Sequence, residues 1–392
     1  MKKIGIIYLG NIKNVGEELL EQNTAYIISK IDATSEVSTI ELSPNKENLT
    51  SNYLIEGFIG KILFRISDLF PISDIKYILK DIAFKVKLSR YFSNYLKGCT
   101  HIIYAVGMLK YSTQDFSYIY KLINNYASNH GIKIMMSAMS VENFNENDWR
   151  CLQLKSAINY KNVKYITTRD TDNELNILKK DYLQPDTSVK TAVVGDVAFW
   201  TKNTYNIPNI DVKNNSIIGV GLIRLGVYKD YGMNIDEEKL YNFYKELITL
   251  LEKSNQEWVL FTNGMIEDYN VGLRLIKDLN LPSEKLLPRP NNPKELINLL
   301  STFKCVMGAR LHSCITSYAL GIPIVGLIWD NKLRAFSKRI KWEEYFIEAD
   351  KLDPQYVIQK LIKVQGEHYD ERLLQQSKQS TFESIKEFLE QN

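Results

Sequence analysis

Apolar and polar residues follow one another along the chain in blocks that predict strands and helices in turn. Lys3–Leu9 is a short apolar run that ends in Gly10-Asn11, and apolar residues then recur at helical spacing from Leu19 to Ile27. A buried parallel strand, a glycine turn and a helix explain this order. The chain is therefore predicted to open with one unit of a doubly wound sheet.

The same alternation continues to about residue 200. Apolar runs predict further strands, and helical patterns such as Phe116–Ser128 and Asp172–Lys180 separate most of them. The predicted strands are Val37–Leu42, His101–Val106, Ile132–Ala138, Tyr165–Thr168 and Thr191–Val194. Strands that alternate with helices are typical of a parallel α/β sheet.

A polar stretch without strand signals occupies residues 201–215, and the alternation then starts again. We expect an N-terminal Rossmann-like domain at 1–200, a linker at 201–215, a C-terminal Rossmann-like domain at 216–375, and a helix at 376–392 that packs back on the first domain. The predicted fold class is α/β with two Rossmann-like domains facing a cleft, and clefts between domains commonly bind small ligands.

Composition excludes several classes of protein. The chain has 392 residues, 45% of them hydrophobic and 24% charged, which is ordinary for a globular protein and excludes whole-chain disorder. Its net charge of +3 is too small to predict nucleic-acid binding. The four cysteines lack metal-binding spacing and are expected to be buried free thiols. No apolar run is long enough to span a membrane, so we expect a cytoplasmic protein.

One basic segment interrupts the alternation. Between residues 61 and 97 lie eight lysines or arginines against three acidic residues, interleaved with Ile, Leu, Phe and Tyr. A basic amphipathic helix can lie on an anionic membrane surface, and the same residues could hold an anionic lipid-linked acceptor. Core helices with a solvated basic face are the simpler interpretation. Peripheral contact at the inner face of the membrane stays an open expectation.

Arg310 and His312 have the strongest chemical pattern. They lie between a predicted strand, Lys304–Met307, and a predicted helix, Ser313–Leu320, where open α/β sheets bind ligands. In an extended turn both side chains would point the same way. Arginine offers a fork for a carboxylate or phosphate, and histidine offers a proton near neutral pH. Taken alone, the pair fits a purely structural role equally well, in which the arginine pairs with a helix carboxylate and the histidine bonds to a backbone carbonyl.

The flanking sequence resembles a known family. The stretch "GARLHSCITSYALGIPIVGLIWDNK" is similar to the C-terminal motif of polysaccharide pyruvyl transferases, with an RxH step, a short helix, GxP, an apolar strand and a lysine. The stretches "YITTRDTDNELNIL", "TAVVGDVAFW", "FTNGMIEDYN" and "YLGNIKNVGEELL" also resemble the family, so that the similarity extends from about residue 5 to 335. In the first domain, "YAVGMLKYS" has Gly107 alone where family members often have a glycine triplet.

The resemblance implies a fold similar to GT-B glycosyltransferases and transfer of pyruvyl from phosphoenolpyruvate to two hydroxyls of one sugar, as a cyclic ketal. The donor carries two anionic groups and so needs more than one cation. The donor-binding candidates are Arg169, Arg224, Arg310, Ser313 and Lys332. His312 is the candidate general acid that protonates the C3 methylene, and Arg310 acts beside it. No cofactor and no protein-held metal are expected.

Acceptor-side candidates are Asn11, Glu17 and Asp196. Glu17 also suits the start of a helix, where a negative charge complements the helix dipole, and Asp196 also suits a turn. Asp170, beside Arg169, could orient that arginine or cap a helix. The acceptor is expected to be a sugar or lipid-linked glycan.

Two other functions fit the same chain. A GT-B glycosyltransferase with a nucleotide-sugar donor would have the same fold, although the cations at the strand ends favour a small dianion over a nucleotide. A non-catalytic sugar- or phosphate-binding protein is the second alternative. Phosphate release that requires both phosphoenolpyruvate and a glycan would exclude this non-catalytic alternative.

Overall fold

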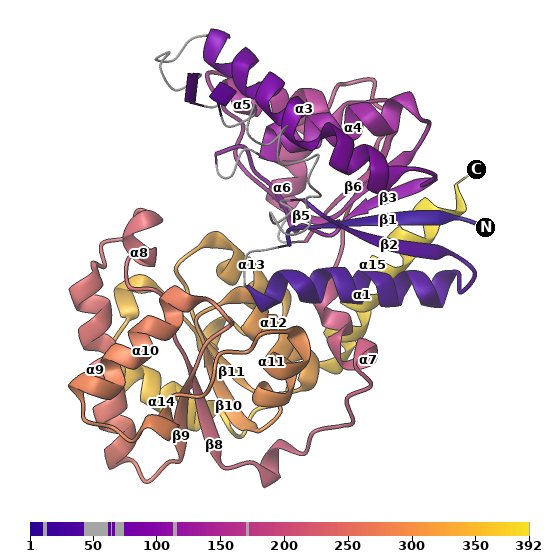
Figure 1. The fold of residues 1–392 in the computed structure, drawn as a ribbon. Helices are drawn as coiled ribbons and strands as arrows, with labels where there is room; N and C mark the ends of the chain where they lie inside the picture. The colour runs from indigo at the N-terminus through magenta and orange to yellow at the C-terminus, as the bar shows by residue number, and fades with distance from the viewer. Residues whose placement is uncertain are drawn as a thin grey trace. The chain divides into compact units, whose positions relative to one another are not determined.

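The computed structural model describes residues 1–10, 14–42, 62–63, 65–66, 74–112, 116–169 and 172–391. The chain forms two compact units (Figure 1). The first comprises Met1–Ile12, Thr24–Gly195 and Ser380–Asn392, and the second comprises Lys13–Asn23 and Asp196–Gln379. Two of the unit boundaries fall inside helices: the one after Asn23 lies in α1 (Val15–Ile31), and the one after Gln379 lies in α15 (Glu371–Glu390).

The first unit is built on a parallel sheet with the strand order β2-β1-β3-β5-β6-β7, and a short β4 pairs with β5. Its strands are β1 (Lys3–Tyr8), β2 (Glu36–Glu41), β3 (His101–Tyr104), β4 (Met108–Leu109), β5 (Lys133–Val141), β6 (Val163–Thr168) and β7 (Lys190–Val193). Its helices include α3 (Asp74–Leu96), α4 (Phe116–Asn129), α5 (Trp149–Ile158) and α6 (Asp172–Ile177). The apolar runs are buried because helices cover a parallel sheet.

The second unit has a five-stranded parallel sheet with the order β12-β11-β10-β8-β9. Its strands are β8 (Ile217–Gly221), β9 (Trp258–Phe261), β10 (Phe303–Gly308), β11 (Ile324–Leu327) and β12 (Phe346–Ile347). Its helices include α7 (Thr201–Thr204), α8 (Val227–Asp230), α9 (Glu237–Lys253), α10 (Ile266–Asp278), α11 (Pro293–Leu300), α12 (Leu311–Leu320), α13 (Asn331–Arg339) and α14 (Pro354–Val364).

Each sheet carries its own apolar core. In the first unit, side chains such as Phe92, Tyr104 and Ile134 are buried in one cluster between sheet and helices. In the second unit, Leu19 of α1 joins Phe261, Phe303 and other side chains around the second sheet. The start of α1 is thus part of the second core, although β1 just before it belongs to the first sheet.

Several strands and helices begin or end at residues other than those predicted from the sequence. The predicted strand Ile132–Ala138 is extended to Val141, through Ala138 at φ 52° and a shift in the pairing with β6. The last helix starts at Glu371, ahead of the predicted start near residue 376, and runs to Glu390. Within 201–215, the polar stretch contains the short helix α7 and a 3₁₀ turn at Val212–Asn214.

In the part of the chain that the structure describes, no helix combines the length and apolarity needed to cross a membrane. All four cysteines are buried and form no disulfide.

Candidate active site

The strand order of the second sheet reverses between two neighbouring strands, β8 and β10. From β8 the chain continues to β9 on one side, whereas β10 lies on the other side of β8. The carboxyl ends of two such strands form the crevice in which open α/β sheets bind ligands. Arg224 follows β8 and Arg310 follows β10, so the fold brings both arginines to this edge.

Arg310 is held by a buried aspartate. Its Nε donates to Oδ2 of Asp268 at 2.9 Å, and its Nη2 donates to Oδ1 at 2.7 Å. Asp268 is fully buried in the first turn of α10, and its Oδ1 also accepts from the backbone N of Arg224 at 2.9 Å. One carboxylate therefore joins the segments that follow β8, β9 and β10. The ion pair uses two of the five guanidinium N–H groups of Arg310, which leaves three for other acceptors.

His312 lies in a helix and not in an extended turn. The predicted start of the helix, Ser313, was wrong, because α12 begins at Leu311 with Arg310 as its N-terminal cap at φ −113° and ψ 136°. The expectation that Arg310 and His312 point the same way in an extended segment was therefore also wrong. Arg310 has extended backbone, whereas His312 is in the first helical turn and is 7% exposed.

The first turn of α1 lies against the ring of His312. A Cβ atom added to Gly16 would come within 2.3 Å of Nδ1 and 2.5 Å of Cγ of His312, closer than any real contact. Only glycine fits this position without displacing the ring. Glu17, the next residue, is also buried. The glycine–acid step near the N-terminus and the RxH step near residue 310 thus belong to one site in the second unit.

Two asparagines hold the start of α1 in this position. Oδ1 of Asn14 accepts from the backbone N of Gly16 at 3.2 Å and from Nδ2 of Asn263 at 2.9 Å. The backbone N of Val15 donates to the carbonyl of Asn263 at 3.3 Å. Asn263 follows β9, is 2% exposed, and its Oδ1 has no hydrogen-bond partner among the residues that the structure describes. The segment after β9 thus supports α1 through Asn263, as it supports Arg310 through Asp268.

Three other donor-side candidates lie in the same unit. Ser313 is buried in the first turn of α12, where its hydroxyl donates to the carbonyl of Arg310 at 2.7 Å. Lys332 is half-buried in the first turn of α13, after Asp330 caps that helix and shortly after β11, the neighbour of β10. Arg224 forms an ion pair with Asp230 at 2.5 Å. The cations thus follow three adjacent strands, β11, β10 and β8.

The remaining candidates are placed differently. Arg169 belongs to the first unit, where it follows β6 and is 4% exposed. Asp196 caps the 3₁₀ turn Val197–Trp200 by accepting from the backbone N of Ala198 at 2.8 Å, which is the turn role considered for it. Asn11 and Asp170 lie outside the described residues.

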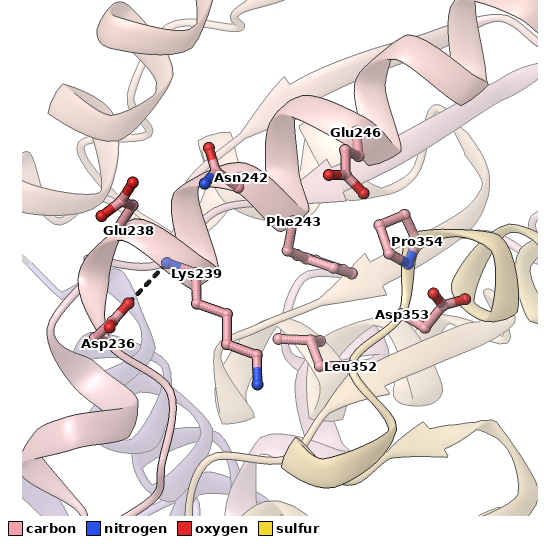
Figure 2. Close-up of a pocket in the computed structure, with 9 residues that line it drawn as sticks. All are labelled: Asp236, Glu238, Lys239, Asn242, Phe243, Glu246, Leu352, Asp353 and Pro354. Atoms are coloured by element: carbon pink, nitrogen blue, oxygen red, sulfur yellow. Dashed lines mark hydrogen bonds between the residues drawn. The ribbon is translucent and has the colours of Figure 1, made fainter.

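A pocket of about 470 Å³ elsewhere in the second unit contains none of the candidate residues (Figure 2). It lies between α9 and the start of α14 and is lined by Asp236, Glu238, Lys239, Asn242, Phe243, Glu246, Leu352, Asp353 and Pro354. Acidic side chains outnumber its single lysine, so the pocket is poorly suited to an anionic donor. Among the described parts of the chain, no three His, Cys, Asp or Glu side chains are grouped so that they could hold a metal ion.

Sequence reasoning missed Asp268, Asn263 and the role of Gly16. All three lie in stretches that were noticed, "FTNGMIEDYN" and "NVGEELL". An acidic residue in the first turn of a helix is ordinary, because it complements the helix dipole. The local pattern therefore could not distinguish Asp268 from a surface acid.

Comparison with known proteins places this site in a family. The family model described as polysaccharide pyruvyl transferase matches residues 14–331, which includes the start of α1, the segment after β9 and the RxH step. No curated protein sequence is significantly similar to the chain.

Solved structures support the fold alone. UDP-GlcNAc 2-epimerase of Methanocaldococcus jannaschii has a TM-score of 0.59 at 12% identity, over 99% of this chain and 99% of that chain. The UDP complex of S. aureus MnaA has a TM-score of 0.54 at 12% identity, over 98% of this chain and 95% of that chain. A UDP-glucosyltransferase from Polygonum tinctorium has a TM-score of 0.51 at 10% identity, over 100% of this chain and 99% of that chain. These similarities and the two parallel sheets confirm the predicted pair of Rossmann-like domains.

Proposed function

The chain belongs to the polysaccharide pyruvyl transferase family, and from this premise we propose that its donor is phosphoenolpyruvate and its product a cyclic pyruvate ketal. Two hydroxyls of one sugar in a polysaccharide precursor add to C2 of the donor. The bond from C2 to the phosphate oxygen breaks, and inorganic phosphate leaves. One hydroxyl proton is balanced by the proton gained at C3, and the other leaves with phosphate.

The observation that supports this proposal best is the row of cations at the carboxyl edge of the second sheet. Arg224, Arg310 and Lys332 follow three adjacent strands, and two of these residues lie at the starts of helices α12 and α13. Helix N-termini and arginine forks both favour carboxylates and phosphates. A compact donor with a carboxylate and a phosphate suits several cations at one edge better than a sugar with few charges does.

His312 is the proposed general acid. A proton added to the C3 methylene makes C2 electrophilic, so that a sugar hydroxyl can attack it. The ring is largely buried and fixed against Gly16, and a fixed acid transfers its proton more effectively than a mobile one. Arg310, two residues before it, is proposed to hold one anionic group of the donor with the N–H groups that Asp268 does not use.

The roles of the other candidates are also proposals. Ser313 and Arg169 are proposed as further donor-binding residues. Asn11, Glu17 and Asp196 are proposed on the acceptor side. Glu17 has the best structural support among these three, because it directly follows Gly16, the residue against which His312 packs.

The decisive experiment is mass spectrometry of candidate glycan and glycolipid acceptors after incubation with the protein and phosphoenolpyruvate. One pyruvyl group added as a ketal increases the acceptor mass by about 70 mass units, with phosphate released in equal amount. UDP- and GDP-sugars serve as parallel donors. A hexose-sized mass gain from one of these, with none from phosphoenolpyruvate, would instead assign the protein to nucleotide-sugar glycosyltransferases.

A further inference from the structure

Helix α3 has one face buried in the core of the first unit. Phe84, Leu88, Tyr91 and Phe92 recur at helical spacing and are all buried. The ring of Phe84 stacks on Tyr118 of α4, with centroids 5.1 Å apart. These contacts fix the orientation of the helix, so its other faces are defined as well.

Between residues 78 and 86, the face turned away from that core is also apolar. Ile78 is 55% exposed and Ile82 is 42% exposed, while Leu79 and Val86 beside them are half-buried. At 100° per residue these four side chains form a continuous stripe opposite the buried one. A helix of a soluble unit normally presents polar residues on this face. Figure 1 shows α3 along the outside of the first unit.

Cations border this stripe on both sides. Lys85 is exposed on one flank, and Arg90 is exposed on the other. The helix contains five lysines or arginines and two aspartates, so it carries a net charge of +3, equal to that of the whole chain. One of the acids, Asp81, lies 3.9 Å from Lys85, but its carboxylate also accepts from Lys121 at 3.3 Å and from Gln153 at 3.1 Å. Its charge is thus balanced within the unit.

We infer that α3 docks on an anionic lipid bilayer, with Ile78 and Ile82 inserted at the level of the headgroups and Lys85 and Arg90 directed to lipid phosphates. An exposed apolar stripe bordered by cations is the pattern of helices that lie in the plane of a membrane interface. The positive charge on both flanks argues for an anionic bilayer and against a second copy of this chain, which would place like charges opposite one another. The inference concerns a helix of the first unit, whereas Arg310 and His312 belong to the second, and it can be tested without any substrate.

The test is co-sedimentation of the full chain with vesicles of neutral phosphatidylcholine, alone or with about one third phosphatidylglycerol. We expect the partition coefficient to be at least tenfold higher for the anionic vesicles and to fall as salt is raised. The double variant Ile78→Asp and Ile82→Asp should lose at least tenfold in binding to anionic vesicles. Ile362→Asp is the matched control, because Ile362 is 54% exposed on α14 of the other unit.

A second variant, which changes a charge and leaves the apolar stripe intact, tests the inference even if the double variant does not fold. Lys85→Glu changes one exposed side chain by two charges, so its binding should fall roughly fivefold for each charge. Equal binding of wild type and variants, equal binding to neutral and anionic vesicles, or no binding at all would overturn the inference. So would a wild-type dimer in solution that Ile78→Asp and Ile82→Asp dissociate, since this would assign the stripe to a second copy. Pyruvyl transfer is measured separately, with a water-soluble acceptor.

Discussion

The guanidinium of Arg310 and the fully buried carboxylate of Asp268 form a two-point ion pair, although the two residues are 42 positions apart in sequence. A buried charge without a partner is costly, so each of these groups constrains the other. Because the same carboxylate accepts from the backbone of Arg224, it orients both segments that border the reversal in strand order. Asp268 is therefore a positioning residue for the proposed donor site.

Asp268→Asn tests this positioning role. The amide of asparagine keeps the shape of the carboxylate and one acceptor oxygen, but it removes the negative charge that holds Arg310. We expect the KM for phosphoenolpyruvate to rise about tenfold or more, with a smaller change in kcat. Steady-state kinetics at saturating acceptor measure the two separately. Asp278→Asn, at the other end of α10, is the control. A lower melting temperature with an unchanged KM would mean that Asp268 supports only the fold.

Gly16→Ala tests the contact between α1 and His312. The new methyl group would lie 2.3 Å from Nδ1, so the ring has to move. A displacement of a catalytic group by about 1 Å can cost around 100-fold in rate, and we expect a loss of kcat of that order. Gly366→Ala is the matched control, because its nearest atom would be 3.9 Å away. An active Gly16→Ala variant would show that the position of the ring is not critical.

His312→Ala tests the proposed acid directly. Loss of a positioned acid should lower kcat by about 10²–10⁴-fold. Donor binding, measured by calorimetry with phosphoenolpyruvate, should change little, because the cations remain. His130, an exposed histidine of the first unit, provides the control variant His130→Ala. Full turnover at saturating donor in the His312→Ala variant would refute the assignment.

Glu21→Gln tests a half-buried carboxyl group in the N-terminal half of α1. Burial, and secondly the charge of Glu18, raise the pKa of Glu21 from 4.5 to about 7. The folded state thus favours the protonated form of Glu21. The contribution of this group to the free energy of unfolding is fully present below about pH 4.5 and is lost as the pH rises through 7. With solvent screening the loss amounts to about 1–2 kcal/mol.

The variant should therefore melt a few degrees higher than wild type at pH 8, and at the same temperature near pH 4.5. Thermal unfolding followed by circular dichroism at both pH values measures this. Glu284→Gln, at an exposed position of the same unit, should show no such difference. An identical pH profile for wild type and Glu21→Gln would contradict the expected cause.

Local patterns determined much of the fold. Apolar runs such as Lys3–Leu9 become buried strands because parallel strands are covered on both faces. Gly321 ends α12 as predicted, with φ 79°. The position of Arg310 at the carboxyl end of β10 follows from a strand, a short turn and a helix in sequence. These features depend on residues within about one or two turns of each other, and such neighbours can be read from the chain directly.

The tertiary structure alone decided which residues meet. Nothing near Arg310 in sequence indicates Asp268, and nothing near His312 indicates Gly16, because these contacts depend on the order of strands in the sheet and on the unit that the start of α1 joins. Helix α12 also starts at Leu311 and not at the predicted Ser313, because the capping of a helix depends on the surroundings of its first turn. Sequence determined the elements and the chemical groups at their ends. Packing between distant segments determined the partner and direction of each group.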